Sequence, residues 1–249
     1  MLKEERFEII LKELNEKKKV KFEDLALLLQ VSEDTIRRDI DILHRNGLLS
    51  KARGGAILRE KDPLTFHDRQ SFLTKEKDII ALKVQSFLKD GMTVFMDGGT
   101  TICAVVNCMP LDIKLRIITN NFSVIPLIDK FKNIELIMLG GNYEVDLAVT
   151  SGVTTCNEVS KYIADLFIMG TCAIDSGFGV SAVSVTDGET KKSMVQSSKR
   201  ILALASQNKL GRAEAFKVCS IENIDSLITD LDSNNPELDA FRNLNIQIV

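Results

Sequence analysis

The chain has 249 residues, of which 45% are hydrophobic and 27% are charged, and its formal net charge is −3. This length allows one large or two modest domains with ample core, and the overall charge excludes a non-specific nucleic-acid binder. No apolar run is long enough to span a bilayer, and the charged N-terminus MLKEERFEII does not resemble a signal peptide. We therefore expect a cytoplasmic location and no membrane partner.

The cysteines indicate neither a metal site nor disulfides. Their number is odd, none forms a Cys-x-x-Cys pair, and the only histidines are His44 and His67. We expect no metal, no cofactor and no catalytic thiol, and we interpret the cysteines as buried small hydrophobic residues. They are Cys103, Cys108, Cys156, Cys172 and Cys219.

The first predicted elements are three helices, over residues 3–17, 23–30 and 33–45. Residues 17–19, between the first two helices, are predicted as a charged turn. In the third helix, Ile36, Ile40 and Leu43 have the spacing of one buried stripe. This pattern predicts a compact three-helix core at the N-terminus.

The start of the third helix has the residue types of a DNA-recognition element. Val31-Ser32 predicts a tight turn, in which Ser32 caps the helix N-terminus. Thr35, Arg37 and Arg38 lie off the buried stripe and are expected to point outward. Arginine donates two hydrogen bonds to guanine and also binds phosphate, so this helix suits the major groove of DNA.

A basic wing is predicted after this helix. Residues 48–58 alternate loosely around Arg53-Gly54-Gly55, which predicts two strands joined by a glycine tip, with Lys51 and Arg53 placed to reach phosphates. Residues 37–61 carry a net charge of +4, which leaves −7 for the rest of the chain. A small helical domain with a solvated charged face is the alternative, but the combination of features favours DNA binding.

These residues resemble the winged helix-turn-helix of DeoR-type bacterial transcriptional regulators. The matching signature is Val31-Ser32, Thr35 to Asp39, Gly47-Leu48 and Gly54-Gly55-Ala56. Arg53 departs from the family pattern, which usually has histidine before the two glycines. Arginine keeps the wing basic, so the resemblance implies altered contacts with retained DNA binding.

The remainder of the chain alternates strands with helices, which predicts a larger α/β domain with a mainly parallel sheet. We place the domains at 1–58 and 75–249, joined by a linker over 59–74. The predicted helices are 74–88, 102–109, 123–130, 154–162 and 189–198. The predicted strands are 93–96, 115–118, 134–139, 166–169, 201–205, 224–228 and 246–249.

Polar turns at the ends of these strands indicate a ligand site, because open α/β sheets bind ligands there. Asp97, Gly98, Gly99, Thr100 and Thr101 follow a strand and open a helix, where free amides favour an anion. The other candidates at strand ends are Asn120, Gly140, Gly141, Lys191 and Lys209. Their alternative interpretation is that the glycines form simple turns and the lysines are solvated.

From residue 76 onward the chain resembles the sensor domain of the same family, which is similar in fold to ribose-5-phosphate isomerase. The matching landmarks are Glu76-Lys77, Asp97 to Thr101, Thr119-Asn120, Gly140-Gly141, Gly152, Asp175, Glu189, Lys191, Met194, Lys209 and Gly211. The resemblance implies that a phosphorylated sugar is the effector. Ser206 stands where the family commonly has aspartate, so the resemblance also allows an atypical effector.

The expected function is a transcriptional repressor that binds operator DNA as a homo-oligomer, dimer or tetramer, and is released by a phosphorylated sugar. Base reading is assigned to Thr35, Arg37 and Arg38, and contacts with the DNA backbone to Ser32, Lys51 and Arg53. The alternative is a sugar-phosphate isomerase with Asp97 or Glu189 as general base, for which no second acid–base group is recognisable. Activation instead of repression is also open.

Overall fold

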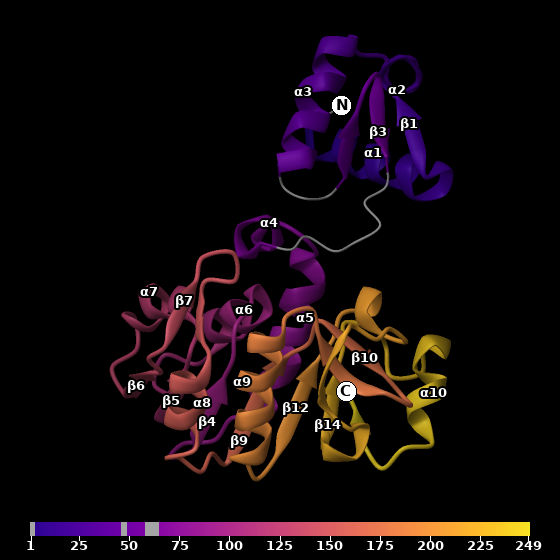
Figure 1. Ribbon diagram of the computed structural model, residues 1–249. Helices are drawn as coiled ribbons and strands as arrows, with labels where there is room; N and C mark the ends of the chain where they lie inside the picture. The colour runs from indigo at the N-terminus through magenta and orange to yellow at the C-terminus, as the bar shows by residue number, and fades with distance from the viewer. Residues whose placement is uncertain (1–2, 46–48, 58–64) are drawn as a thin grey trace. The chain divides into compact units, whose positions relative to one another are not determined.

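A computed structural model describes residues 3–45, 49–57 and 65–249 of the chain. The chain divides into two compact units, the first ending at Leu73 and the second beginning at Thr74 (Figure 1). Within the described ranges, every helix is too short or too polar to cross a bilayer. Several residues of the predicted DNA-binding segment lie outside the described residues, namely Asn46, Gly47, Leu48, Arg59 and Lys61.

The N-terminal unit has the three predicted helices and the predicted wing. The elements are α1 (Lys3–Lys17), β1 (Lys19–Lys21), α2 (Phe22–Leu29), α3 (Glu33–Arg45), β2 (Ser50–Ala52) and β3 (Gly55–Ile57). The strands form an antiparallel sheet in the order β1-β3-β2. The prediction of a charged turn over 17–19 is wrong at its end, because Lys19 begins a strand whose partner, β3, lies far along the sequence.

The buried stripe of α3 is confirmed. Ile36, Ile40 and Leu43 are each 0% exposed and pack in one core with the apolar faces of α1 and α2. Leu49 and Ala56, at either end of the wing, complete this core. The sheet therefore shares the core that holds α3 in place.

A short helix, α4 (Phe66–Gln70), lies within the segment predicted as a linker. The hydroxyl of Thr65 accepts the N–H of Asp68 at 3.1 Å and caps this helix. The sequence prediction missed α4 because a helix of this length has too few apolar positions to show a period.

The sequence predicted a mainly parallel sheet, and the C-terminal unit is built on a parallel sheet of seven strands. The strand order is β15-β14-β12-β9-β4-β5-β6. The strands are β4 (Thr93–Met96), β5 (Leu115–Thr119), β6 (Ile134–Met138), β9 (Leu166–Gly170), β12 (Ile201–Leu204), β14 (Ser226–Ile228) and β15 (Gln247–Ile248).

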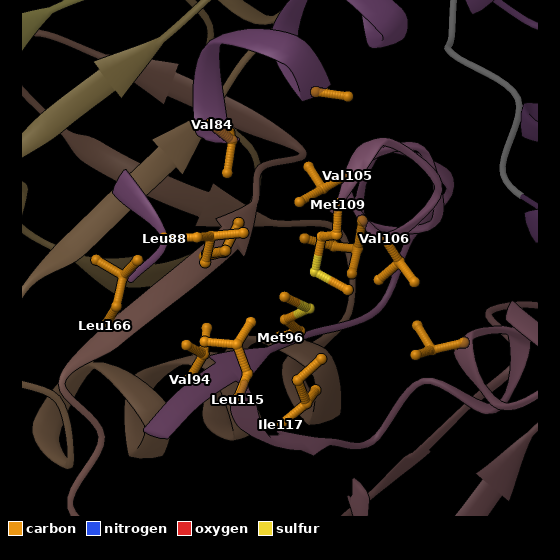
Figure 2. Packing of buried hydrophobic residues seen from close by; sticks show 14 of the residues in the cluster. Val84, Leu88, Val94, Met96, Val105, Val106, Met109, Leu115, Ile117 and Leu166 are labelled. Carbon is orange, nitrogen blue, oxygen red and sulfur yellow. The ribbon is translucent and has the colours of Figure 1, made fainter. Parts of the chain in front are cut away.

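Alternate residues of each strand enter two different cores, one on each face of the sheet. Val94 and Met96 of β4 pack with α5 (Thr74–Val84) and α6 (Thr100–Cys108), whereas Phe95 packs in the core of the opposite face. Figure 2 shows the first of these cores, where Val105, Val106 and Met109 lie over the strand residues. The sheet is therefore covered on both faces, as parallel sheets require.

The core of the second face is closed by helices and by a small antiparallel sheet that the sequence did not predict. The helices are α8 (Val153–Val159), α9 (Val185–Gln196) and α10 (Asp239–Arg242). The sheet has the order β10-β11-β13, from β10 (Ala173–Asp175), β11 (Gly179–Ala182) and β13 (Phe216–Cys219). These strands are too short for a period-two pattern to be evident.

Several further predictions changed in detail. A hairpin of β7 (Asn142–Glu144) and β8 (Val149–Ser151) follows β6, and α7 (Ile125–Ile128) is shorter than predicted. Helix α9 begins at Val185 instead of 189, because the hydroxyl of Ser184 caps it by accepting the N–H of Asp187. This earlier start places Asp187 and Lys191 one turn apart on the same helix.

Candidate functional sites

The N-terminus of α3 is capped as predicted. The hydroxyl of Ser32 accepts the N–H of Thr35 at 3.3 Å, and the two hydroxyl groups are 2.9 Å apart. The N–H of Val31 donates to the carbonyl of Ala26 at 3.1 Å and closes the turn after α2. The start of α3 is therefore fixed relative to α2, and the exposed Ser32 stands beside it.

The two arginines of α3 have different surroundings. Both are exposed, but a terminal nitrogen of Arg37 lies 3.4 Å from a carboxylate oxygen of Glu33, and its guanidinium carbon lies 5.3 Å from the centroid of the Phe22 ring. Within the part of the chain that the structure describes, Arg38 forms no ion pair.

The wing is attached to the rest of the unit at its glycine tip. Gly54 has a φ of 82°, and its carbonyl accepts the N–H of Phe22 at 3.0 Å. A Cβ atom at Gly55 would lie 2.0 Å from the carbonyl oxygen of Val20. Both glycines are therefore required by geometry: Gly54 for its left-handed backbone, and Gly55 for its close approach to β1.

The two basic side chains predicted on the wing also differ in their contacts. Lys51 pairs with Asp41 of α3, and its backbone N–H donates to Nδ1 of His44 at 3.3 Å. Arg53 is exposed in the turn between β2 and β3. The wing thus presents Arg53 to solvent, while Lys51 joins it to α3.

Sequence reasoning missed a buried ion pair behind α3. Arg6 of α1 donates from Nε and Nη2 to the two carboxylate oxygens of Asp39, at 2.7 and 3.2 Å. Asp39 is only 3% exposed. A carboxylate at the edge of the buried stripe was the only available signal, and it does not identify a partner 33 residues away.

In the C-terminal unit, the predicted effector residues meet where the order of the sheet reverses. From β4 the chain builds β5 and β6 on one side and β9, β12, β14 and β15 on the other. Asp97 directly follows β4, and its Oδ1 accepts the N–H of Gly170, the last residue of β9, at 2.8 Å. This switch point is the usual ligand position in doubly wound sheets.

A cluster of three buried charges lies at this point. The ammonium of Lys191 is 2.8 Å from Oδ2 of Asp97 and 2.6 Å from Oδ1 of Asp187. Asp97 is 1% exposed, Lys191 3% and Asp187 9%. The structure therefore brings together two predicted residues, Asp97 and Lys191, and adds Asp187, whose spacing to Lys191 on α9 was the available signal.

The pKa values of two members of this cluster, Asp97 and Lys191, are both raised. Burial raises the pKa of Asp97 to about 6, although the nearby ammonium of Lys191 acts in the opposite direction. Burial lowers the pKa of Lys191, but the carboxylates of Asp187 and Asp97 outweigh this and hold it above its ordinary value. Lys191 is therefore charged at neutral pH, and the fully ionised cluster carries one net negative charge.

Two asparagines follow β5 at the same edge. The side-chain amide of Asn121 donates to the carbonyls of Asp97 and Gly99, each at 3.3 Å, and so holds the loop after β4. Asn120 donates to the carbonyl of Thr150 at 2.7 Å. Its Oδ1 is buried and has no partner within the described residues, which leaves a free acceptor in this region.

The glycine loop after β4 opens at one position. A Cβ at Gly98 would lie 2.5 Å from a methyl of Val149, whereas a Cβ at Gly99 would meet no atom within 4 Å. No side chain caps the N-terminus of α6, where Thr100 is buried and Thr101 half-buried. The first turn of α6 therefore keeps amide groups available beside Gly99.

The remaining predicted residues are bound mainly within the unit itself. The N–H of Gly140 donates to the carboxylate of Glu158 at 2.8 Å, and a Cβ at Gly141 would lie 2.1 Å from the Thr155 hydroxyl. The ammonium of Lys209 donates to the carbonyl of Thr171, directly after β9, at 2.6 Å. The glycine pair thus has a close-packed turn, and Lys209 lies at the switch point.

The structure also describes Glu189, one of the two general bases of the enzyme alternative, and Ser206, the position that departs from the family pattern. Glu189 is exposed and lies 3.8 Å from Lys192, away from the buried cluster. The hydroxyl of Ser206, the position where the family commonly has aspartate, donates to Oδ1 of Asn208 at 2.7 Å. Of the two proposed general bases, only Asp97 belongs to the buried cluster.

These features define a two-part protein in which a winged helix-turn-helix unit accompanies a doubly wound α/β unit with a polar cluster at its switch point. Residues 6–62 match the model of the DeoR-like helix-turn-helix domain, and residues 73–231 match that of the DeoR C-terminal sensor domain. The chain belongs to the DeoR family of transcriptional regulators.

Relatives named as repressors match over most of their length. The HTH-type transcriptional repressor GlcR of Bacillus subtilis is 31% identical, over 96% of each chain. The glycerol-3-phosphate regulon repressor of Escherichia coli is 31% identical, over 85% of this chain and 84% of the relative. Among solved structures, ribose 5-phosphate isomerase A of Neisseria gonorrhoeae has a TM-score of 0.39 and 16% identity, and the match covers 54% of this chain and 52% of that one.

Proposed function

We propose that the chain is a repressor of a carbohydrate-metabolism operon, and that a phosphorylated sugar bound in its C-terminal unit lowers its affinity for operator DNA. The observation that carries this proposal is the combination of a capped, arginine-bearing recognition helix with a charged cluster at a sheet switch point in one chain. The names of the relatives support repression, and one of them names a phosphorylated metabolite, glycerol 3-phosphate.

In this proposal α3 enters the major groove and the wing contacts the DNA backbone. Thr35 and the two arginines of α3 face the bases or the groove edges, and Ser32 binds phosphate at the helix N-terminus. The exposed Arg53 supplies a phosphate contact from the wing tip. Lys51 adds a second one and also neutralises Asp41, which would otherwise repel the DNA.

The effector would bind with its phosphate and its hydroxyl groups at different places. The first turn of α6, with Gly99, Thr100 and Thr101, offers amides and hydroxyls to the phosphate. Two carboxylates outweigh the one ammonium in the buried cluster, so that cluster favours hydroxyl donors and not a second anion. The free Oδ1 of Asn120 provides a further acceptor for a hydroxyl.

The effector shifts the repressor between two states only if it binds one of them more tightly. We propose a homo-oligomer, a dimer or a tetramer, in which the spacing between the recognition helices must match two half-sites. Effector binding at the switch point would change that spacing. The chain would bind the sugar phosphate without converting it.

The first test compares Thr101→Glu with Thr101→Gln in the full chain, because the two side chains differ mainly by one charge. The melting temperature is measured with glucose 6-phosphate, fructose 6-phosphate and glycerol 3-phosphate, and with glucose, glycerol and inorganic phosphate as controls. We expect a sugar phosphate to raise the melting temperature of the wild type and of Thr101→Gln, and not of Thr101→Glu, whose carboxylate repels the phosphate.

The second test captures fragments of genomic DNA from the source organism on the purified protein, with and without the sugar phosphate identified in the first test. Selective enrichment of promoter fragments that is lost with the sugar phosphate is the expected result. Equal stabilisation of the two Thr101 variants would place the phosphate elsewhere. Isomerisation of the sugar phosphate above the uncatalysed rate would favour the enzyme alternative instead.

A further inference from the structure

We propose that the two adjacent arginines of α3 have separate tasks, in which Arg38 reads a guanine in the major groove and Arg37 positions the helix by binding a backbone phosphate. This inference rests on the proposed DNA-binding function and specifies how the sequence of the operator is read. It assigns the guanine preference of the first half of α3 to one side chain.

The geometry of the helix separates the two positions. Ile36 and Ile40 are both 0% exposed and mark the side of α3 that faces the core. With about 100° of rotation per residue, Arg38 lies about 160° from both of them, directly opposite the core. Arg37 lies only about 60° from Ile40 in the same projection. Arg38 therefore projects from the outermost line of the helix, and Arg37 from its flank.

The contacts of Arg37 hold it on that flank. Its guanidinium lies over the ring of Phe22, the first residue of α2, and pairs with Glu33 one turn earlier in α3. Phe22 is only 5% exposed, so the ring provides a fixed platform. Cation–π contact and an ion pair together favour this orientation over one that points straight into the groove.

Arg38 has the surroundings that base reading needs. It is exposed, forms no ion pair among the residues that the structure describes, and stands in the second turn after the Ser32 cap. Residues in the N-terminal half of a recognition helix contact base edges, and the forked guanidinium matches O6 and N7 of guanine. Two carboxylates lie on the same helix face, Asp34 four residues before Arg38 and Asp41 three residues after it, and Asp41 is neutralised by Lys51.

The test works with random DNA and does not require a known operator. Full-length wild type, Arg38→Ala, Arg38→Lys and Arg37→Ala each select binding sites from a library of random 30-base-pair duplexes at near-physiological salt. Fluorescence anisotropy then measures the affinity for the wild-type consensus and for the same duplex with each guanine replaced. Thermal unfolding establishes that every variant is folded.

We expect Arg38→Ala to reduce the affinity ratio between the consensus duplex and the duplex with one guanine replaced by about 10- to 100-fold. Arg38→Lys should reduce this ratio too, since an ammonium cannot donate the two parallel hydrogen bonds of a guanidinium. Arg37→Ala should select the same motif, bind both duplexes more weakly by one common factor, and reduce the slope of log affinity against log salt by about 1. Loss of guanine preference in Arg37→Ala, or its retention in Arg38→Ala, would overturn the assignment. A wild type that selects no motif at all would refute DNA recognition itself, and the inference with it.

Discussion

Arg6 in α1 and Asp39 in α3 form a bidentate ion pair within the N-terminal unit. The Nε and Nη2 atoms of Arg6 lie 2.7 and 3.2 Å from the two carboxylate oxygens of Asp39. Asp39 follows Arg38 directly in sequence, and its side chain is 4% exposed. The pair therefore fixes the rotation of α3 about its own axis, and that rotation decides which side chains face the DNA. In this way a buried contact controls an exposed surface.

Replacing Asp39 with alanine should destabilise the N-terminal unit by about 3 kcal/mol, because it removes the carboxylate that balances a largely buried guanidinium. Urea unfolding followed by circular dichroism measures this change. Lys21→Ala is the control, since it removes an ion pair whose side chains are 70% and 61% exposed, and it should have no measurable effect. Equal effects of the two substitutions would contradict the structural role of the buried pair.

The two glycines of the wing should respond differently to alanine. Gly54→Ala costs about 1 kcal/mol, because its φ of 82° strains any other residue although the space is open. Gly55→Ala should cost about 3 kcal/mol, because its Cβ would meet the backbone of β1 and separate β1 from β3. Thermal unfolding of the two variants ranks them, and the opposite order would show that the wing packs differently.

The buried cluster should make stability depend on pH in a specific direction. The pKa of Asp97 is raised to about 6 by burial, so the folded state binds its proton more tightly than the unfolded state does. The stabilising contribution of Asp97 is therefore complete below about pH 4 and is lost as the pH rises through about 6. The Asp97→Asn variant lacks this pH dependence. The free energy of unfolding of the variant minus that of the wild type should therefore increase between about pH 4 and about pH 6, by at most about 3 kcal/mol.

Denaturant unfolding at intervals between about pH 4 and pH 7 measures this difference. Asp112→Asn, at an exposed position, controls for the loss of one negative charge and should follow the wild-type profile. A constant difference between Asp97→Asn and wild type across the window would contradict the raised pKa of Asp97.

Thiol reactivity provides a further test. Burial raises the pKa values of Cys103 and Cys219 to about 11, which leaves very little thiolate at pH 8. Titration of the native protein with an aromatic disulfide reagent should leave these two thiols unreacted, whereas all five cysteines should react in denaturant. Cys103→Ser and Cys219→Ser should therefore not change the number of thiols that react in the native state.

Local patterns in the sequence were sufficient for most of the longer helices, for the strands of the parallel sheet and for several positions of the candidate sites. The spacing of Ile36, Ile40 and Leu43 predicts α3, and Ser32 predicts its cap, because both signals come from residues within a few positions of one another. The glycine tip of the wing and the polar turn after β4 were recognisable for the same reason.

Only the tertiary structure decided which distant residues meet. Arg6 with Asp39 and Asp97 with Lys191 are far apart in sequence, and β1 pairs with β3 of the wing although α2 and α3 lie between them in the chain. Likewise, the strand order that places Asp97 beside β9 depends on the complete sheet. Periodicity and capping act over one or two turns, whereas the partners of a buried charge are chosen by packing of the whole unit. The sequence by itself thus determined most of the longer helices, the strands of the parallel sheet and their polar ends, and the fold decided the short strands and which charged groups meet.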